Sequence, residues 1–212
     1  MVTHGTDERS LPLRERKKLR TRRALADAAL RLFAEQGFDA TTLEELAEEA
    51  EVSKSTFSRT FPAKEAAGIE AESEVWTGYL EALADSELTG PLFAELHRTL
   101  AAATAALDPT WDERFLATRR LIAAEPALLR YTEHYRAQVK EQLAATLAAK
   151  LGLDADDLRL HVLAELVMTA WSLSGRAWVR AGGKGGRPAL LAGFANAIDA
   201  VPASLTLTAP AS

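Results

Sequence analysis

Cysteine is absent from the 212 residues, which excludes disulfides, thiolate metal sites and cysteine nucleophiles. β-Branched residues are scarce beside alanine and leucine, and this balance favours helices over strands. No apolar run approaches the roughly 18–20 residues that a membrane span needs, and no apolar signal segment follows the first charged residues. We therefore expect an all-α, cytoplasmic protein without a membrane partner.

Patterns that would indicate catalysis or metal binding are also missing. The four histidines are scattered and show neither an HExxH motif nor a paired metal-ligand spacing. The stretch AGGKGGRP resembles a phosphate loop, but it lacks the GxxxxGK[ST] spacing and follows a predicted helix, so we interpret it as a connector. We expect no metal, no cofactor and no enzymatic activity.

Positive charge is concentrated in one segment near the start of the chain. The net charge is −5, from 25 basic and 30 acidic residues. The segment RERKKLRTRR, residues 14–23, nevertheless holds seven Arg or Lys against one Glu. Such a run suits the sequence-independent attraction to nucleic-acid phosphates, although a solvated face or a tail would have the same composition.

Apolar periodicity and punctuation predict about nine consecutive helices. The expected helices cover residues 14–36, 43–50, 54–61, 63–84, 91–107, 110–124, 126–151, 155–181 and 188–200. The expected organisation is a flexible tail over 1–13, a three-helix DNA-binding domain over 14–79, a larger helical ligand-binding and dimerisation domain over 80–201, and a flexible tail over 202–212. Gly68 is expected to soften the helix over 63–84, which makes that helix a candidate lever between the two domains.

Residues 42–61 have the spacing of a helix-turn-helix. Thr42 with Glu45 gives a capping box, and Ser53 can cap the second helix. Phe57 and Phe61 lie four residues apart and share one face. A hairpin this small needs the preceding helix as a third wall, with an expected core of Leu32, Phe33, Leu43, Leu46, Val52, Phe57 and Phe61.

The polar side of the second hairpin helix would then enter a DNA major groove. Bases and phosphates would be contacted by Ser53, Lys54, Ser55, Thr56, Ser58, Arg59 and Thr60, with Arg20, Arg22 and Arg23 in the basic segment. Arg59 suits a bidentate contact to guanine. On spacing alone, an ordinary solvated helical hairpin fits about as well.

From about residue 19 to residue 79 the chain resembles the DNA-binding domain of the TetR family of transcriptional regulators. The resemblance rests on the nearly continuous match of ALADAALRLFAEQGFDATTLEELAEEAEVSKSTFSRTFPAKEA, residues 24–66. It implies that Thr42 contacts phosphate, that residues 54–60 form the recognition helix, and that Lys64 contacts the DNA backbone. Beyond residue 79 the resemblance is architectural: a divergent helical domain that binds a ligand and dimerises.

Four positions depart from the family pattern. Glu51 occupies a turn position that is usually Gly, so the turn must accept a Cβ and a negative charge. Ser58 and Thr60 replace the usual aromatic pair of the recognition helix, and Ala63 replaces a usual capping Ser. Glutamates 44, 45, 48, 49 and 51 also weaken the local positive field. The operator sequence therefore cannot be carried over from relatives.

The helices after residue 90 supply candidates for a ligand site and a dimer interface. The ligand candidates are Trp111, Phe115, Arg119, Tyr131, Tyr135, Trp171 and Ser174. The last helix has a broad apolar face that resembles the family's dimer interface, with Leu190, Leu191, Phe194, Ala197 and Ile198. An ordinary intramolecular core would give the same stripes. A similarity of residues 115–178 to an actinobacterial-type subset indicates an acyl-CoA-like effector.

Two hypotheses from different classes follow. The first is a homodimeric repressor that a small, largely apolar effector releases from a palindromic operator, because two related reading heads gain the specificity that one lacks. The alternative is a helical binding or scaffold protein whose hairpin binds DNA weakly or not at all, motivated by the acidic helix and the missing aromatics. The sequence leaves open the effector, the operator, and whether the regulator represses or activates.

Overall fold

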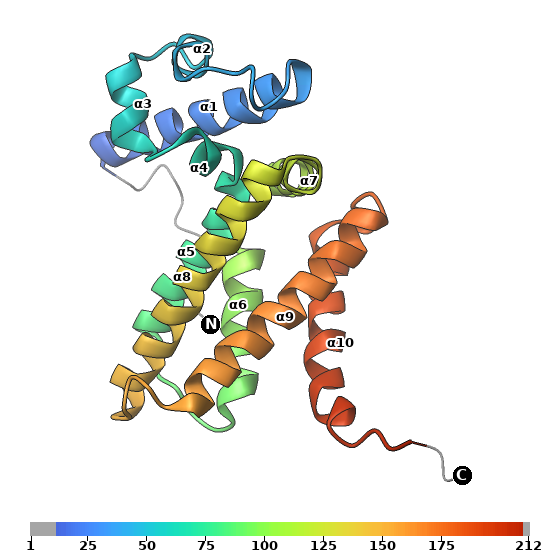
Figure 1. The fold of residues 1–212 in the computed structure, drawn as a ribbon. Coiled ribbons are helices and arrows are strands. Elements are labelled where there is room, and N and C mark those ends of the chain that lie inside the picture. The colour runs from blue at the N-terminus through green and yellow to red at the C-terminus, as the bar shows by residue number, and fades with distance from the viewer. Residues whose placement is uncertain (1–11, 210–212) are drawn as a thin grey trace. The chain divides into compact units, whose positions relative to one another are not determined.

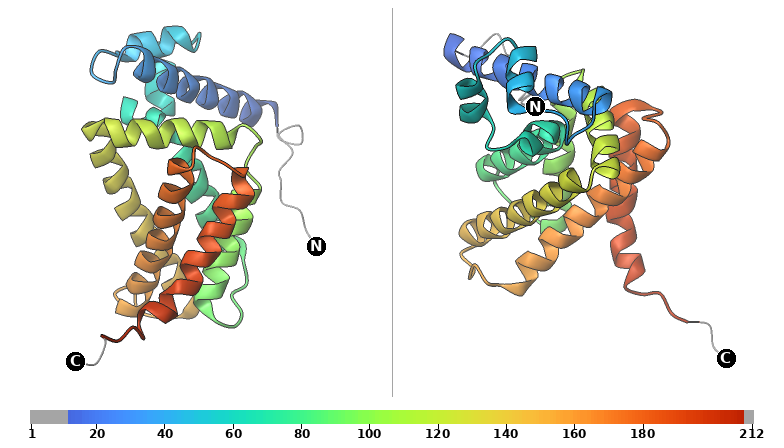
Figure 2. Two further views of the ribbon diagram at one scale, coloured as in Figure 1. Left: turned by 90° about the vertical axis from the view of Figure 1, so that its right-hand side faces the viewer. Right: turned by 45° about the horizontal axis from the view of Figure 1, so that its top comes forward.

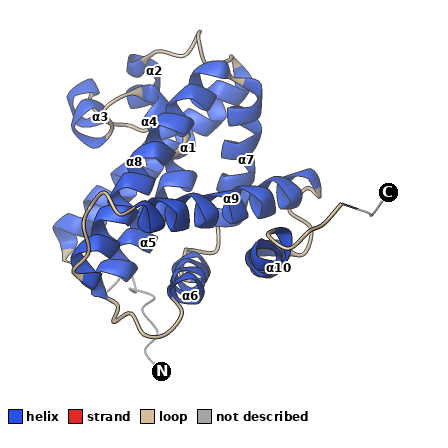
Figure 3. Cartoon of the chain, turned by 60° about the horizontal axis from the view of Figure 1, so that its bottom comes forward, coloured by secondary structure: helices blue, strands red, loops and turns tan. Residues whose placement is uncertain are grey.

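The computed structural model describes residues 12–209 and contains ten helices in that range. Every described residue is helix or loop, which confirms the expected all-α class (Figure 3). None of these helices is long and apolar enough to cross a membrane. The expected tails over 1–13 and 202–212 fall partly outside the described residues: helix α1 begins at Leu13, and the last helix continues to Ser204.

The chain divides into two compact units, Met1–Glu74 with Ala106–Tyr135, and Val75–Ala105 with Arg136–Ser212. We describe each separately as unit 1 and unit 2. This division differs from the expected boundary after residue 79. Residues 106–135, which we assigned to the ligand-binding domain, group instead with the N-terminal helices, because α7 contacts α1.

Unit 1 is organised around the long helix α1 (Figure 1). Its helices are α1 (Leu13–Glu35), α2 (Leu43–Glu49), α3 (Lys54–Thr60), α4 (Lys64–Gly68), the start of α5 (Glu70–Asp85), α7 (Trp111–Ala124) and the start of α8 (Pro126–Leu151). Helix α1 contacts α2, α3, α4 and α7. It ends where Gly37 takes the left-handed conformation, at φ 90°, which is typical of a glycine after the last turn of a helix.

The core of unit 1 matches the expectation for the helical hairpin. Phe33, Leu46, Phe57 and Phe61 are all at most 2% exposed. The other three expected core residues, Leu32, Leu43 and Val52, are partly buried against them. Ile122 of α7 and Leu128 of α8 complete this core, so two elements that follow residue 105 help to bury the three N-terminal helices.

The predicted continuous helix over 63–84 is wrong, because the chain breaks at Ile69 between α4 and α5. Gly68 at the end of α4 has little room around it. A Cβ there would lie 2.9 Å from Phe33 Cε2 and 3.2 Å from Leu128 Cδ2. The glycine therefore permits a close approach of helices, rather than softening a long lever.

Unit 2 contains the rest of α5 and α8 together with α6 (Leu92–Ala105), α9 (Leu158–Arg180) and α10 (Gly186–Ser204). Helices α9 and α10 run side by side (Figure 2), and both contact α6. Small side chains allow the approach of α9 and α10: the Ser174 hydroxyl donates to the Leu190 carbonyl at 2.7 Å, and a Cβ on Gly193 would lie 3.1 Å from that hydroxyl. The connector over 182–186 turns through four glycines with positive φ.

Candidate nucleic-acid interface

The hairpin of α2 and α3 begins each helix with a side-chain cap. The Thr42 hydroxyl accepts from the Glu45 backbone N–H at 3.2 Å, and the Glu45 carboxylate accepts from the Thr42 backbone N–H at 2.8 Å. This is the predicted capping box. The Ser53 hydroxyl likewise accepts from the Thr56 backbone N–H at 3.2 Å. Both caps fix where the short helices start, and Thr42 remains exposed at the beginning of α2.

Two aromatic anchors orient α3. Phe57 and Phe61 are each 1% exposed, and their ring centroids lie 6.0 Å apart. Since the two rings hold one side of the helix against the core, the opposite side faces outward. Its exposed members are Ser53, Lys54, Ser55, Ser58 and Arg59, and we refer to these five residues as the reading face.

Two of the predicted contact residues, Thr56 and Thr60, are only half-exposed. The Thr60 hydroxyl donates to the Thr56 carbonyl at 2.7 Å, and Arg59 Nη2 donates to the Thr56 hydroxyl at 3.3 Å. Both threonine hydroxyls therefore serve the helix itself, whereas the reading face carries the outward polar groups. The face is short and hydroxyl-rich, with a cation near each end of α3.

The turn between α2 and α3 accommodates Glu51 in an unusual conformation. Its φ is +54°, and it is the only non-glycine residue with positive φ among residues 12–209. The Glu51 N–H donates to the Glu48 carbonyl at 2.9 Å, and the next N–H, of Val52, donates to the Ala47 carbonyl at 2.8 Å. The geometry is that of a left-handed helix end, where glycine carries no Cβ penalty.

The acidic side chains of α2 are partly neutralised by cations. The Lys54 ammonium pairs with Glu44, and Arg31 of α1 pairs with Glu49. The hydrogen bond from Lys54 holds the pKa of Glu44 below its usual value. The first cation of the reading face therefore already has an anionic partner, which the spacing of residues 44 and 54 did not reveal.

Arg22, a predicted DNA contact, is bound inside unit 1. Its guanidinium makes a two-point ion pair with Glu70, in which Nη2 lies 2.6 Å from Oε2. It also donates to the Thr60 carbonyl at 3.0 Å and lies 4.4 Å from the centre of the Phe61 ring. Burial raises the pKa of Glu70, while Arg22 opposes that shift. Arg22 thus fastens the C-terminal end of α3 to the start of α5.

Lys64 also binds within the protein. Its ammonium donates to the carbonyls of Phe38 and Thr41 at 2.6 and 2.9 Å and lies 4.1 Å from the centre of the Phe38 ring. Two of its three N–H donors are thereby used. In this geometry Lys64 holds the loop that leads to the Thr42 cap, at the N-terminus of α2.

Arg23 belongs to a third ionic cluster in unit 1. Its guanidinium lies 2.7 Å from Asp108, and Arg114 of α7 binds the same carboxylate at 2.7 Å and Glu74 at 2.9 Å. This cluster joins α1 to α7. Arg20 is exposed on α1, as a phosphate contact requires.

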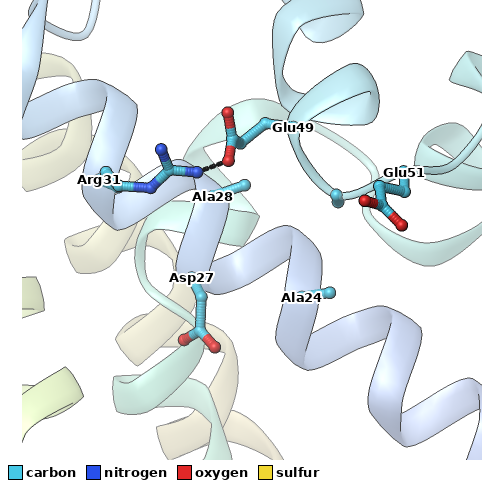
Figure 4. Close-up of a pocket in the computed structure, with 7 residues that line it drawn as sticks. Ala24, Asp27, Ala28, Arg31, Glu49 and Glu51 are labelled. Atoms are coloured by element: carbon cyan, nitrogen blue, oxygen red, sulfur yellow. Dashed lines mark ion pairs between the residues drawn. The ribbon is translucent and has the colours of Figure 1, made fainter.

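A shallow depression of about 350 Å³ lies between α1 and α2 in unit 1 (Figure 4). Its lining residues are Ala24, Asp27, Ala28, Arg31, Glu49, Ala50 and Glu51. The lining holds three carboxylates and one guanidinium, and that guanidinium is already paired with Glu49, so the depression does not suit a phosphate. In residues 12–209, no group of three or more His, Cys, Asp or Glu side chains is arranged to hold a metal ion.

The predicted ligand residues are distributed over both units. Trp111, Phe115, Arg119, Tyr131 and Tyr135 all belong to unit 1. Trp111 and Phe115 are fully buried, Trp111 donates to the Ala71 carbonyl at 2.8 Å, and Arg119 pairs with buried Glu72 at 3.2 Å. These contacts stabilise the unit that carries the reading face.

Trp171 and Ser174 lie in unit 2. Ser174 already donates to the Leu190 carbonyl, where α9 approaches α10. Trp171 is fully buried and belongs to a group of aromatic rings that includes Trp76 and Phe194. Sequence reasoning did not select Trp76 or its neighbour Tyr79 as ligand candidates, because both have the ordinary periodicity of a core helix.

Three of the five predicted dimer residues face the interior of unit 2. Leu190 and Phe194 are fully buried and Ile198 is 7% exposed, while Leu191 and Ala197 are half-buried. The Phe194 ring lies 5.0 Å from His97 and 5.6 Å from Trp171. We therefore correct the expected interface for Leu190, Phe194 and Ile198, which pack within their own unit, whereas the part expected of Leu191 and Ala197 stays a prediction.

Two capped short helices, an anchored second helix and an exposed polar face define a helix-turn-helix DNA-binding domain. Comparison with known families agrees with this class. Residues 25–66 match the description "Bacterial regulatory proteins, tetR family", and residues 91–204 match "MftR C-terminal domain". The chain belongs to the TetR family of transcriptional regulators, which confirms the resemblance found in the sequence.

Individual proteins similar to this chain share a third or less of their aligned residues with it. The HTH-type transcriptional regulator TcmR of Streptomyces glaucescens is 33% identical over 153 residues, which cover 68% of this chain and 66% of that protein. A transcriptional regulator from Rhodococcus sp. Rha1 has 20% identity and a TM-score of 0.49, over 86% of this chain and 96% of that one. The TetR-family repressor FadR of Thermus thermophilus, solved with lauroyl-CoA, has 22% identity and a TM-score of 0.46, over 90% and 98%.

Proposed function

We propose that the protein is a homodimeric, effector-responsive transcriptional repressor whose α3 reads a palindromic operator. The observation that carries this proposal is the reading face: five exposed polar residues on a short helix, held outward by buried Phe57 and Phe61. Of its two cations, Lys54 is paired with Glu44, whereas the geometry of the Arg59 guanidinium suits guanine. Thr42, exposed at the start of α2, is proposed as a phosphate contact.

Variants of Arg59 test this reading directly. Arg59→Ala should weaken binding to a DNA fragment that flanks the protein's own reading frame by about 5–100-fold, the range for loss of a bidentate base contact. It should also relax the base preference at one operator position. Arg120→Ala is the matched control, because Arg120 is exposed on α7 and is not part of the reading face. Equal losses in both variants in a gel-shift titration would argue against base reading by α3.

Dimerisation is proposed through the outward side of α9. Leu158, Val162 and Leu173 are 73%, 46% and 50% exposed and lie on one side of that helix. A second copy would cover these apolar side chains, and a twofold dimer would present two reading faces to a palindrome. Leu173→Glu should convert the dimer to a monomer in light scattering. Leu129→Glu, at a leucine that is 46% exposed on α8, should leave it dimeric.

The effector is proposed to be small and largely apolar, in keeping with the interior of unit 2. The effector would bind one conformation of the dimer more tightly than another. It would thereby change the fraction of dimers whose reading faces fit the operator. The acyl-CoA-like class stays a prediction from the sequence similarity of residues 115–178.

A scaffold protein with an inactive hairpin remains the rival function, and one observation favours it. Lys54, Lys64, Arg22 and Arg23 all make ion pairs or carbonyl contacts within unit 1. If those contacts persist beside DNA, these four side chains contribute little to phosphate binding. Binding that neither depends on salt nor distinguishes the flanking DNA from scrambled DNA would favour this rival.

A further inference from the structure

The hydroxyl of Tyr79 is buried without a hydrogen-bond partner among the described residues. Tyr79 lies on α5 in unit 2, and its side chain is fully buried. Other buried hydroxyls of the unit are satisfied: Thr104 donates to the Leu100 carbonyl at 2.8 Å, and Ser174 donates to the Leu190 carbonyl at 2.7 Å. A buried unpaired donor destabilises a fold, so its presence at this position needs an explanation.

A chain of aromatic ring contacts leads from Tyr79 through four helices of unit 2. Trp76 lies 6.2 Å from Tyr79 and 6.0 Å from Trp171, Trp171 lies 5.6 Å from Phe194, and Phe194 lies 5.0 Å from His97, measured between ring centroids. All four contacts are edge-to-face. We call these five residues the aromatic cluster. Aromatic linings with one or two polar groups are typical of small-molecule sites.

Few charged side chains are buried in the described part of unit 2. Glu95 and Arg136 are the buried charged residues among the described part of unit 2. Glu95 pairs with Arg98, and Arg136 also has a partner. Burial raises the pKa of Tyr79, so its phenol keeps its proton and can act as a donor at neutral pH. The missing partner is therefore an acceptor, and the one buried cation in the described part of unit 2, Arg136, already has a partner.

We propose that the aromatic cluster binds a planar, uncharged effector whose carbonyl-type oxygen accepts a hydrogen bond from the Tyr79 hydroxyl. The inference rests on the proposed effector-responsive function and names the chemical class of the effector. Ring faces and edges of the cluster stack on a planar molecule, while the phenol selects for an acceptor. Because the rings now contact one another, the effector binds a conformation in which they separate, and it stabilises that conformation by mass action.

The first test uses the protein without effector. Tyr79→Phe removes the unpaired hydroxyl and keeps the ring, so the melting temperature should rise by about 2–4 °C. The matched control is Tyr135→Phe, which removes a hydroxyl that donates to the Ser73 carbonyl at 3.4 Å and should leave the melting temperature unchanged or lower. A lower melting temperature for Tyr79→Phe would show that the hydroxyl already has a partner and would overturn the proposal.

The second test uses two probes of equal shape, 2-acetylnaphthalene and 2-ethylnaphthalene, of which only the first has an acceptor oxygen. By calorimetry, the wild-type protein should bind the ketone about tenfold more tightly, one hydrogen bond's worth of preference. Tyr79→Phe should bring that ratio to about one while keeping the hydrocarbon affinity. An unchanged ratio, or binding of lauroyl-CoA with no binding of either naphthalene, would overturn the assignment.

DNA binding by the same wild-type protein separates the two proposals. If the protein binds its flanking DNA specifically but shows no ketone preference, the effector class is wrong and the regulator function stands. If it prefers the ketone but does not bind DNA specifically, the regulator function is wrong and the ligand site stands. Release of DNA by 2-acetylnaphthalene, lost in Tyr79→Phe, would support both.

Discussion

Replacement of Glu51 by glycine should stabilise the protein. Glu51 has φ +54° in the turn between α2 and α3, a conformation that costs a residue with a Cβ about 1–2 kcal/mol. Glycine avoids this cost but loses about 0.5–1 kcal/mol more backbone entropy on folding. The difference predicts a gain of about 0.5–1 kcal/mol, which corresponds to a rise of about 1–4 °C in melting temperature for a chain of this length.

The matched control separates backbone strain from charge. Glu51→Gln keeps the Cβ and removes the negative charge, so its stability should stay within about 0.5 kcal/mol of the wild type, as for most exposed substitutions. Both variants remove one charge near the reading face and should raise DNA affinity equally. The measurements are thermal melts followed by circular dichroism and DNA titrations by fluorescence anisotropy. Equal stabilisation by Gln and Gly would refute the strain argument, as would a loss of stability in Glu51→Gly.

Three further substitutions test other contacts in unit 1. Lys64→Met should lower the melting temperature and leave unchanged the slope of log DNA affinity against log salt concentration, because the Lys64 ammonium binds two loop carbonyls. A slope smaller by about one would instead indicate a phosphate contact. Glu44→Gln removes the anionic partner of Lys54 and should strengthen DNA binding a few-fold at low salt but hardly at 1 M salt. Unchanged affinity in anisotropy titrations would contradict the ion pair between Lys54 and Glu44. Gly68→Ala should cost about 1–3 kcal/mol in denaturant titrations, because its Cβ would press on the Phe33 ring; a neutral result would contradict the close approach.

Local sequence signals predicted the hairpin well. The caps at Thr42 and Ser53 and the paired anchors Phe57 and Phe61 each depend on residues within four positions of one another. Such features are encoded in short spacings, so a single sequence contains them. Strain at Glu51 was also expected, because this residue occupies a turn position where the family usually has glycine.

Long-range contacts were not predictable in the same way. Arg22 and Glu70 are 48 residues apart, and Lys64 lies 26 residues from Phe38. A basic residue that binds a distant carboxylate or carbonyl has the same sequence context as one that binds DNA. The break at Ile69 depends on how closely Gly68 approaches Phe33 and Leu128, which periodicity does not encode.

Apolar stripes show which side of a helix is buried but not by what. The stripe with Leu190, Phe194 and Ile198 was expected to face a second protomer, yet it packs inside unit 2. Trp111 and Phe115 were expected in the ligand-binding domain, yet they group with the N-terminal helices. In both cases the burial was foreseen and the partner was not, because the partner is set by tertiary packing.

Salt-dependent binding of the full chain to the DNA flanking its own reading frame tests the central claim most directly. Anisotropy titrations between about 50 and 200 mM salt should show specific binding whose affinity falls steeply with salt, with a log–log slope of about −0.9 for each phosphate contacted. Scrambled DNA of the same length should bind at least about a thousandfold more weakly. Equal affinity for the two DNAs, at any salt concentration in this range, would contradict the assignment of α3 as a reading helix.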